Sequence, residues 1–92
     1  MQLSFIKNIQ FTKLIKADGR LREFNFRRYN SGNQLQPAIF SVNVVDNRDN
    51  RILFEMQKED NLWKIIKQPL PQWILENETN FHESIEEELK LS

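Results

Sequence analysis

Apolar and polar side chains alternate along residues 9–17 and 20–29, which is the pattern of two half-buried β-strands. Asp18-Gly19 lies between these stretches. A two-residue type I′ turn needs positive φ at both central residues, and this residue pair tolerates it. The turn predicts the register: Phe11 faces Phe26, Lys13 faces Phe24 and Ile15 faces Arg22, all on one face. Because the turn and the alternation select the same register, we expect an antiparallel hairpin.

Three further strands are predicted after a polar segment that ends at Pro37. Residues 38–45 alternate, a short polar connection follows at 46–50, and a second alternating stretch leads to the Asp60-Asn61 turn and to residues 62–67. Together the strands present one apolar face, made of Ile9, Phe11, Ile15, Phe24, Phe26, Phe40, Val42, Val44, Ile52, Phe54, Met56, Trp63 and Ile65. Residues 1–8 either extend the first strand or cross the core.

The period of the pattern changes after Ile66, and Pro71 suits the first turn of a helix. The apolar positions then follow a helical stripe: Leu70, Ile74, Phe81, Ile85 and Leu89. Asn80 and Glu83 have the spacing of a capping box, so the helix either runs on or restarts near Thr79-Asn80. The stripe is the natural cover for the apolar sheet face, because each surface alone would remain in water.

The pattern therefore predicts one α+β domain over residues 1–92. A four- to five-stranded antiparallel β-meander occupies residues 9–67, and a C-terminal helical region at 71–90 packs on its apolar face. Leu, Ile, Val and Phe make up 29 of the 92 residues, which is well above the roughly 20% below which chains tend to be disordered.

The absence of cysteine excludes disulfides, zinc–thiolate sites and thiol catalysis, and it favours a reducing compartment. No apolar run reaches the roughly 20 residues that span a bilayer, so no membrane association is expected. The first ten residues carry Lys7 and Asn8 where a signal peptide would be apolar. We therefore expect a cytoplasmic protein.

Charge is unevenly distributed, although the net charge is zero. Residues 1–67 hold 12 Lys and Arg against 7 Asp and Glu, and the remainder holds one Lys against six Glu. Either both surfaces are simply solvated, which we favour, or the basic sheet binds a polyanion. Residues 20–29 interleave arginines with aromatic residues, a combination that holds single-stranded nucleic acid. Because the register buries Phe24 and Phe26, the candidate nucleic-acid-binding residues on the outer face are Lys16, Arg27, Tyr29 and Lys67.

In the order of its elements alone, strands followed by a helix, the chain resembles the Pur-type single-stranded nucleic-acid-binding repeats. It carries no diagnostic motif of that family, and its predicted fifth strand departs from the pattern.

Trp73 and Leu75 lie off the helical stripe and are the candidate partner-binding residues. Trp73 lies about 100° around the axis from Ile74, at the border between core and solvent. It either caps the core, which we favour, or anchors a partner. The strand at residues 62–67 is a further candidate, because an edge strand can recruit another strand.

Catalytic chemistry finds little support in the sequence. Glu78, His82 and Glu86 recur at four-residue spacing and could meet one metal ion, but a solvated acidic flank of a helix is the better interpretation. A nucleophile with a matching base and a glycine-rich phosphate loop are both missing. We therefore expect no catalytic, cofactor or metal residues.

The sequence favours a small non-enzymatic binding or interaction domain, with a protein partner or self-association, without naming the partner. The alternative is a single-stranded nucleic-acid-binding domain that uses the basic outer sheet face.

Overall fold

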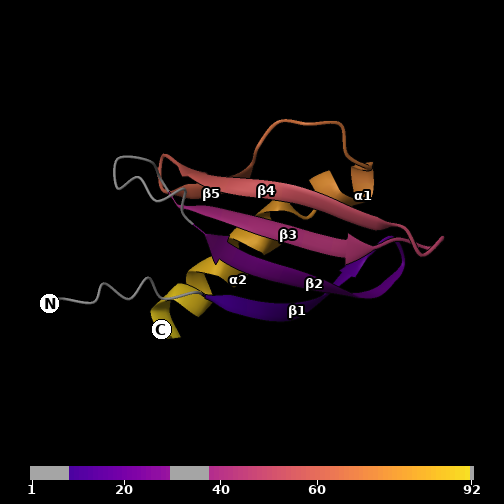
Figure 1. The fold of residues 1–92 in the computed structure, drawn as a ribbon, viewed down its shortest axis with the longest axis horizontal. Coiled ribbons are helices and arrows are strands. Elements are labelled where there is room, and N and C mark those ends of the chain that lie inside the picture. The colour runs from indigo at the N-terminus through magenta and orange to yellow at the C-terminus, as the bar shows by residue number, and fades with distance from the viewer. Residues whose placement is uncertain (1–8, 30–37, 92) are drawn as a thin grey trace, which may run out of the picture.

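The computed structural model describes residues 9–29 and 38–91, which form one sheet and two helices (Figure 1). The elements are β1 (Gln10–Ala17), β2 (Arg20–Tyr29), β3 (Ile39–Val45), β4 (Arg51–Glu59), β5 (Leu62–Ile65), α1 (Gln72–Leu75) and α2 (Glu78–Leu91). All strand pairs are antiparallel and the strand order is β1-β2-β3-β4-β5. The predicted α+β meander is therefore confirmed, with all five strands. The question about residues 1–8 lies outside the described residues.

The first hairpin has the predicted register, with Phe11 opposite Phe26. Its turn places Asp18 at φ 53° and Gly19 at φ 83°, the positive values that a type I′ turn requires. Asp60 and Asn61 repeat this geometry between β4 and β5, with φ values of 51° and 69°. The two short turns thus fix which side chains of their strands share a face.

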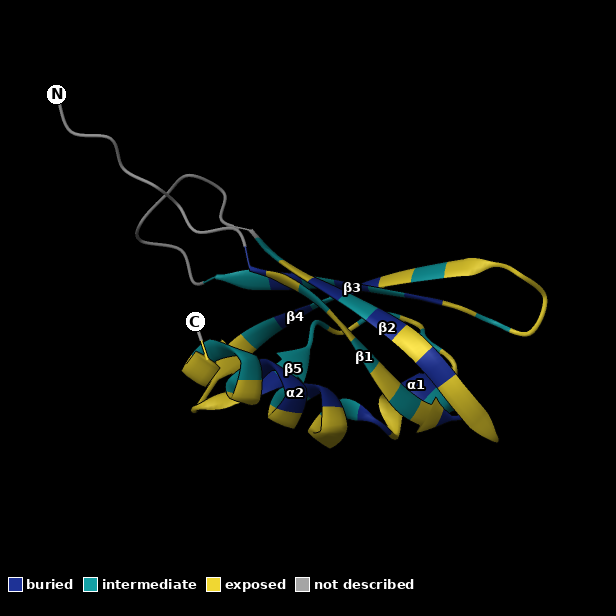
Figure 2. Cartoon of the chain, turned by 90° about the horizontal axis from the view of Figure 1, so that it is seen from below, coloured by how far each residue is buried: buried dark blue, intermediate teal, exposed yellow. Residues whose placement is uncertain are grey.

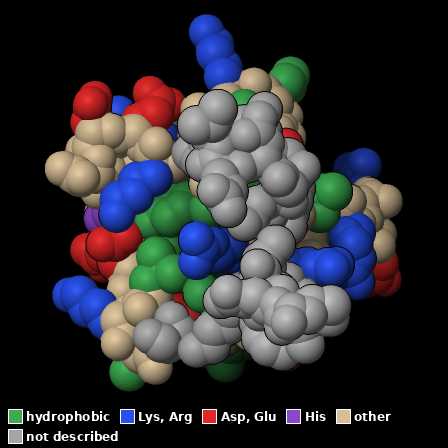
Figure 3. All heavy atoms as spheres, turned by 60° about the vertical axis from the view of Figure 1, so that its left-hand side comes forward, with side chains coloured by type: hydrophobic (Ala, Val, Ile, Leu, Met, Phe, Trp, Pro, Cys, Tyr) green, Lys and Arg blue, Asp and Glu red, His purple; other side chains and the backbone are tan. Residues whose placement is uncertain are grey.

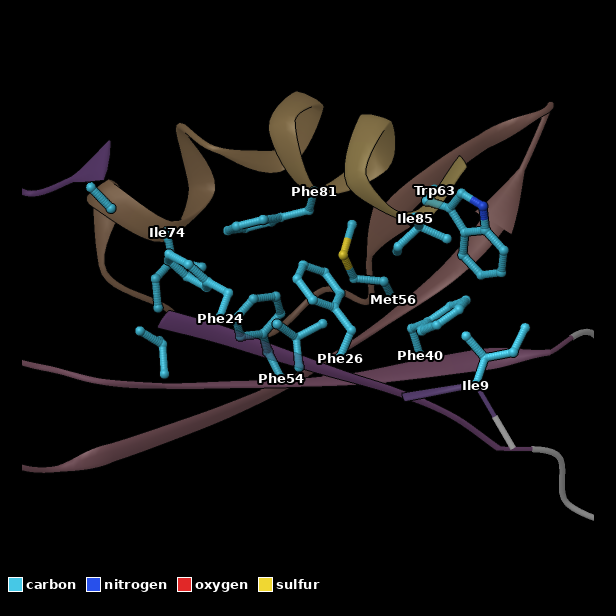
Figure 4. Packing of buried hydrophobic residues seen from close by; sticks show 13 residues of the cluster. Ile9, Phe24, Phe26, Phe40, Phe54, Met56, Trp63, Ile74, Phe81 and Ile85 are labelled. Atoms are coloured by element: carbon cyan, nitrogen blue, oxygen red, sulfur yellow. The ribbon is translucent and has the colours of Figure 1, made fainter. Parts of the chain in front are cut away.

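The core lies between the inner face of the sheet and the two helices (Figure 4). All thirteen residues predicted for the apolar face, and all five of the helical stripe, are buried in this core or pack against it. Phe81 of α2 lies at its centre, with ring centroids 4.9 Å from Phe24 and 5.5 Å from Phe54. Figure 2 shows the consequence, since buried residues alternate with exposed ones along β2 and the helices lie beneath only one face.

The C-terminal helical region is two helices, and the interruption lies at Glu76-Asn77. The sequence left open whether the helix is continuous through Thr79-Asn80, and in the structure α2 runs through both residues without a break. The backbone carbonyl of Asn77 accepts the Phe81 N–H at 3.0 Å, which begins α2. Asn80 lies inside α2, and its Nδ2 donates to Asn77 Oδ1 at 2.7 Å.

The β1–β2 and β3–β4 hairpins diverge toward their turns (Figure 2). β2 pairs with β3 only from Asn25 onward, whereas β3 remains paired with β4 as far as Val45. Arg22 fills the resulting gap from the inner side and is 6% exposed. Its guanidinium donates to the Ala17 carbonyl at 2.8 Å, to the Val45 carbonyl at 3.2 Å and to Asn47 Oδ1 at 2.6 Å.

Candidate interaction surface

The two margins of the sheet are built differently, and the β5 margin is closed by α2. The backbone N–H of Trp63 donates to His82 Nδ1 at 3.0 Å, and that of Ile65 donates to Glu78 Oε2 at 2.8 Å. The next residue, Ile66, donates its N–H to the Glu55 carbonyl of β4 at 2.8 Å. Because N–H directions alternate along a strand, the N–H groups of Trp63 and Ile65 point away from β4. Helix side chains thus take the places that a further strand would occupy at β5.

Glu86, one turn beyond His82, adds a third contact from α2 to β5. Its Oε2 accepts the Trp63 indole N–H at 2.9 Å and the Lys58 ammonium at 3.3 Å. The indole hydrogen bond and then the bond from Lys58 hold the pKa of the Glu86 carboxyl below its ordinary value of 4.5, against the opposing effect of burial. Within the described residues, no three His, Asp or Glu side chains converge as metal ligands.

A lowered pKa makes the folded state sensitive to acid. The folded protein binds the Glu86 proton less readily than the unfolded chain does, so this contribution to stability is present above pH 4.5 and lost as the pH falls through the lowered pKa. Urea titrations at neutral and acidic pH should show Glu86→Gln losing less stability on acidification than the wild type does. Glu83→Gln, an exposed change on the same helix, should keep the wild-type pH dependence. Equal acid sensitivity in all three proteins would contradict the assignment.

The β1 margin, in contrast, is open within the described part of the chain. Arg28 N–H donates to the Ile9 carbonyl at 2.8 Å, which makes Ile9 and Arg28 a hydrogen-bonded pair. Hydrogen-bonded positions alternate along an antiparallel strand, so the backbone groups of the even-numbered residues 10–16 point away from β2. No other described residue donates to or accepts from those backbone groups. Figure 1 shows β1 as the outermost strand on this side.

Exposed apolar side chains accompany this open margin. We use "outer face" for the sheet surface turned away from the helices. Leu14 of β1 is 61% exposed on it, and Leu21 of β2 is its exposed diagonal neighbour, since Leu14 faces Glu23 and Lys16 faces Leu21. Leu53 of β4, an interior strand, is 59% exposed on the same face. The outer face thus offers apolar side chains both at the edge and away from it.

Two hollows on the outer side meet at Asn25 and Arg51. One, of about 340 Å³, lies between the diverging hairpins, and its lining includes arginines (Arg20, Arg22 and Arg51) as well as acidic residues (Glu23, Asp46 and Asp49). The other, of about 320 Å³, lies over β1 to β4 and is lined largely by uncharged polar groups. A row of hydrogen bonds crosses it, from Thr12 to Asn25, from Asn25 to Asn43 and from Arg51 to Asn43. Charges of both signs in the first hollow do not single out an anionic ligand.

The structure does not bring the candidate nucleic-acid-binding residues together. Lys16 of β1 lies opposite Leu21 of β2, and Arg27 lies six residues beyond Leu21 along β2. Lys16 and Arg27 are therefore about 20 Å apart along the strand direction. Lys67 follows β5 at the opposite margin, and the side chain of Tyr29 lies outside the described part. Figure 3 shows Lys and Arg side chains scattered over one side of the molecule, with acidic side chains between them.

Trp73 and Leu75, the candidate partner-binding residues, have different surroundings. Trp73 packs against the core, with its ring centroid 6.5 Å from that of Phe24, and the Arg22 guanidinium lies 4.9 Å from its ring centroid. Leu75 is 42% exposed at the end of α1. The two residues therefore do not form one exposed patch.

Sequence reasoning missed two features of these surfaces. The spacing of Glu78, His82 and Glu86 did indicate a shared flank of α2, but that flank caps a strand edge. The predicted register placed Arg22 on the apolar face. A charged residue on an apolar face indicates a buried hydrogen-bond network, and the sequence contained this signal.

No protein-family model matches the chain, and no curated protein and no solved structure is found to be similar to it. In the described residues no helix is long and apolar enough to cross a membrane.

Proposed function

We propose that the chain is a non-enzymatic protein-interaction domain, which binds an extended polypeptide segment along β1. The observation that carries the proposal is the difference between the two sheet margins. Side chains of α2 occupy the outward N–H groups of β5, whereas β1 presents a row of outward backbone groups over eight residues. Such a row pairs with another extended chain, and neighbouring side chains supply the specificity.

The side chains beside β1 support a polypeptide as the ligand. Leu14 and Leu21 place exposed apolar surface next to the edge. The dispersal of Lys16, Arg27 and Lys67 argues in the same direction, because a single strand of nucleic acid needs cations along one continuous path.

The only histidine and a buried serine have structural partners, which supports a non-enzymatic role. His82 Nδ1 accepts the Trp63 N–H, and Ser84 Oγ donates to the Asn80 carbonyl at 2.8 Å. A general base needs its lone pair for a substrate proton, and this nitrogen already uses it within the fold.

Fluorescence anisotropy with a labelled peptide of residues 9–17 tests the proposal. The full chain should bind the peptide saturably. Leu14→Pro should abolish binding, because proline removes an outward N–H and is tolerated at edge positions whose N–H faces solvent. Leu53 lies on an interior strand, where proline would disrupt the sheet, so Leu53→Pro cannot serve as the control. Leu53→Lys serves instead and should leave peptide binding unchanged. Circular dichroism must show that each variant is folded.

A second edge variant protects the test against misfolding. Leu14→Lys keeps the backbone N–H and adds an edge charge of the kind that discourages strand addition. It should weaken peptide binding while the melting temperature remains near that of the wild type. Full binding by both Leu14 variants would refute the assignment of β1 as the binding edge.

A further inference from the structure

We propose that the partner of β1 is β1 of a second copy of this chain, so that two copies form one continuous antiparallel sheet about a two-fold axis. This inference rests on the proposed function and names its occupant. The two-fold axis crosses the sheet near Leu14, and the outer faces of both copies lie on the same side.

The pleat restricts the registers that two β1 strands can adopt. In an antiparallel pair, residues with outward backbone groups must lie opposite one another. These are the even-numbered residues of β1 in both copies, and their side chains all lie on the outer face. Even-numbered residues of one copy therefore lie opposite even-numbered residues of the other. A two-fold axis also places one residue of β1 opposite the same residue of the second copy.

The register with Leu14 opposite Leu14 fits the side chains best. Leu14 and Leu21 of each copy then form one apolar cluster across the axis. Lys16 lies opposite Thr12, and Lys13 on the inner face lies opposite Ile15. No two like charges of β1 face each other in this arrangement.

The neighbouring registers are less favourable. A shift in one direction centres the axis on Lys13 and places Leu14 opposite Thr12, so the leucines of the two copies no longer face each other. The opposite shift places Leu14 against Lys16 and separates the leucines of the two copies.

The charge of Lys13 does not obstruct pairing in the proposed register. Its Nζ lies 3.2 Å from Glu87 Oε1 of α2, on the inner side of the sheet. The cation is therefore held within its own copy by an opposite charge, rather than being directed along the β1 margin.

The closed β5 margin limits the assembly to two copies. A chain with two open edges would extend into a fibre, whereas His82 and Glu78 already accept the outward N–H groups of Trp63 and Ile65 on β5. Pairing through β1 uses the one open margin of the described sheet in each copy. The contact is thus self-complementary and closes as a dimer.

Disulfide cross-linking tests the register directly, because the natural chain has no cysteine. Leu14→Cys in the full chain should form a cross-linked dimer on mild oxidation. Directly opposed Cα atoms in a hydrogen-bonded pair lie about 5.5 Å apart, within the range of a disulfide. Leu53→Cys, equally exposed on an interior strand, should stay monomeric on a non-reducing gel. Efficient cross-linking of Lys13→Cys instead would overturn this register.

Sedimentation equilibrium of the untagged full chain tests the dimer itself. The wild type and Leu53→Lys should sediment as dimers, and Leu14→Lys should dimerise at least about tenfold more weakly because it sets two cations together at the axis. An undiminished dimer in Leu14→Lys would place the interface elsewhere and overturn the proposal.

The outcomes separate this inference from the proposed function. A wild type that remains monomeric at high concentration, yet binds the 9–17 peptide, overturns self-association and leaves β1 as a docking edge for another polypeptide. A monomer that binds no 9–17 peptide overturns the pairing of β1 with itself, whereas the proposed function is overturned by full peptide binding in both Leu14 variants. Species larger than a dimer overturn the closure at β5.

Discussion

Replacing Phe81 with alanine is expected to lower the free energy of unfolding by about 3–5 kcal/mol, the cost of truncating a fully buried phenylalanine. The ring is completely buried and lies between the helix and the sheet. It contacts Phe24 and Phe26 of β2 and Phe54 of β4, with centroid distances of 4.9, 6.1 and 5.5 Å. Its loss leaves a cavity that rigid strands on one side cannot collapse to fill.

The loss is large for a domain of this size, because a folded protein is stable by only about 5–15 kcal/mol. Urea unfolding followed by circular dichroism should show a lower midpoint with a similar slope. Leu91→Ala on the same helix removes an exposed side chain and should change stability by less than about 0.5 kcal/mol. Equal stability of the two variants would mean that α2 does not cover the sheet as described.

Replacing Arg22 with methionine should cost about 3 kcal/mol, although the change introduces an apolar side chain into a buried position. The guanidinium donates to the carbonyls of Ala17 and Val45 and to Asn47, thereby joining the two diverging hairpins. Asp18 lies 3.6 Å away as a more exposed counter-charge. Methionine fills the volume but leaves these acceptors without their donor.

Two matched variants isolate the geometry of this network. Arg22→Lys keeps the charge but has no planar fork, so it should recover only a small part of the loss. Arg20→Met removes an exposed arginine from the same strand and should have little effect. Urea titration gives the free energy of unfolding of Arg22→Met, Arg22→Lys and Arg20→Met. A stable Arg22→Met protein with its hairpins still joined would show that apolar packing on Trp73, and not the hydrogen bonds, bridges the gap.

Much of the fold could be predicted because its determinants are local. The Asp18-Gly19 turn and the alternation around Phe11 and Phe26 both depend on neighbours in sequence, and they agree on one register. The helix boundary was predicted less well. Asn80 has the residue type of an N-cap, but α2 already begins after Asn77, an asparagine three positions earlier, and capping patterns alone do not rank two such asparagines.

The sequence by itself determined the meander, the apolar face and the helix that covers it, since periodicity and turn chemistry act over a few residues. Only the tertiary structure decided which sheet margin is open. The closing bonds join Trp63 to His82 and Ile65 to Glu78, and the lengths and curvature of all the elements set whether those atoms meet. The position of Arg22 follows the same rule, because its acceptors belong to two hairpins whose divergence no local pattern encodes.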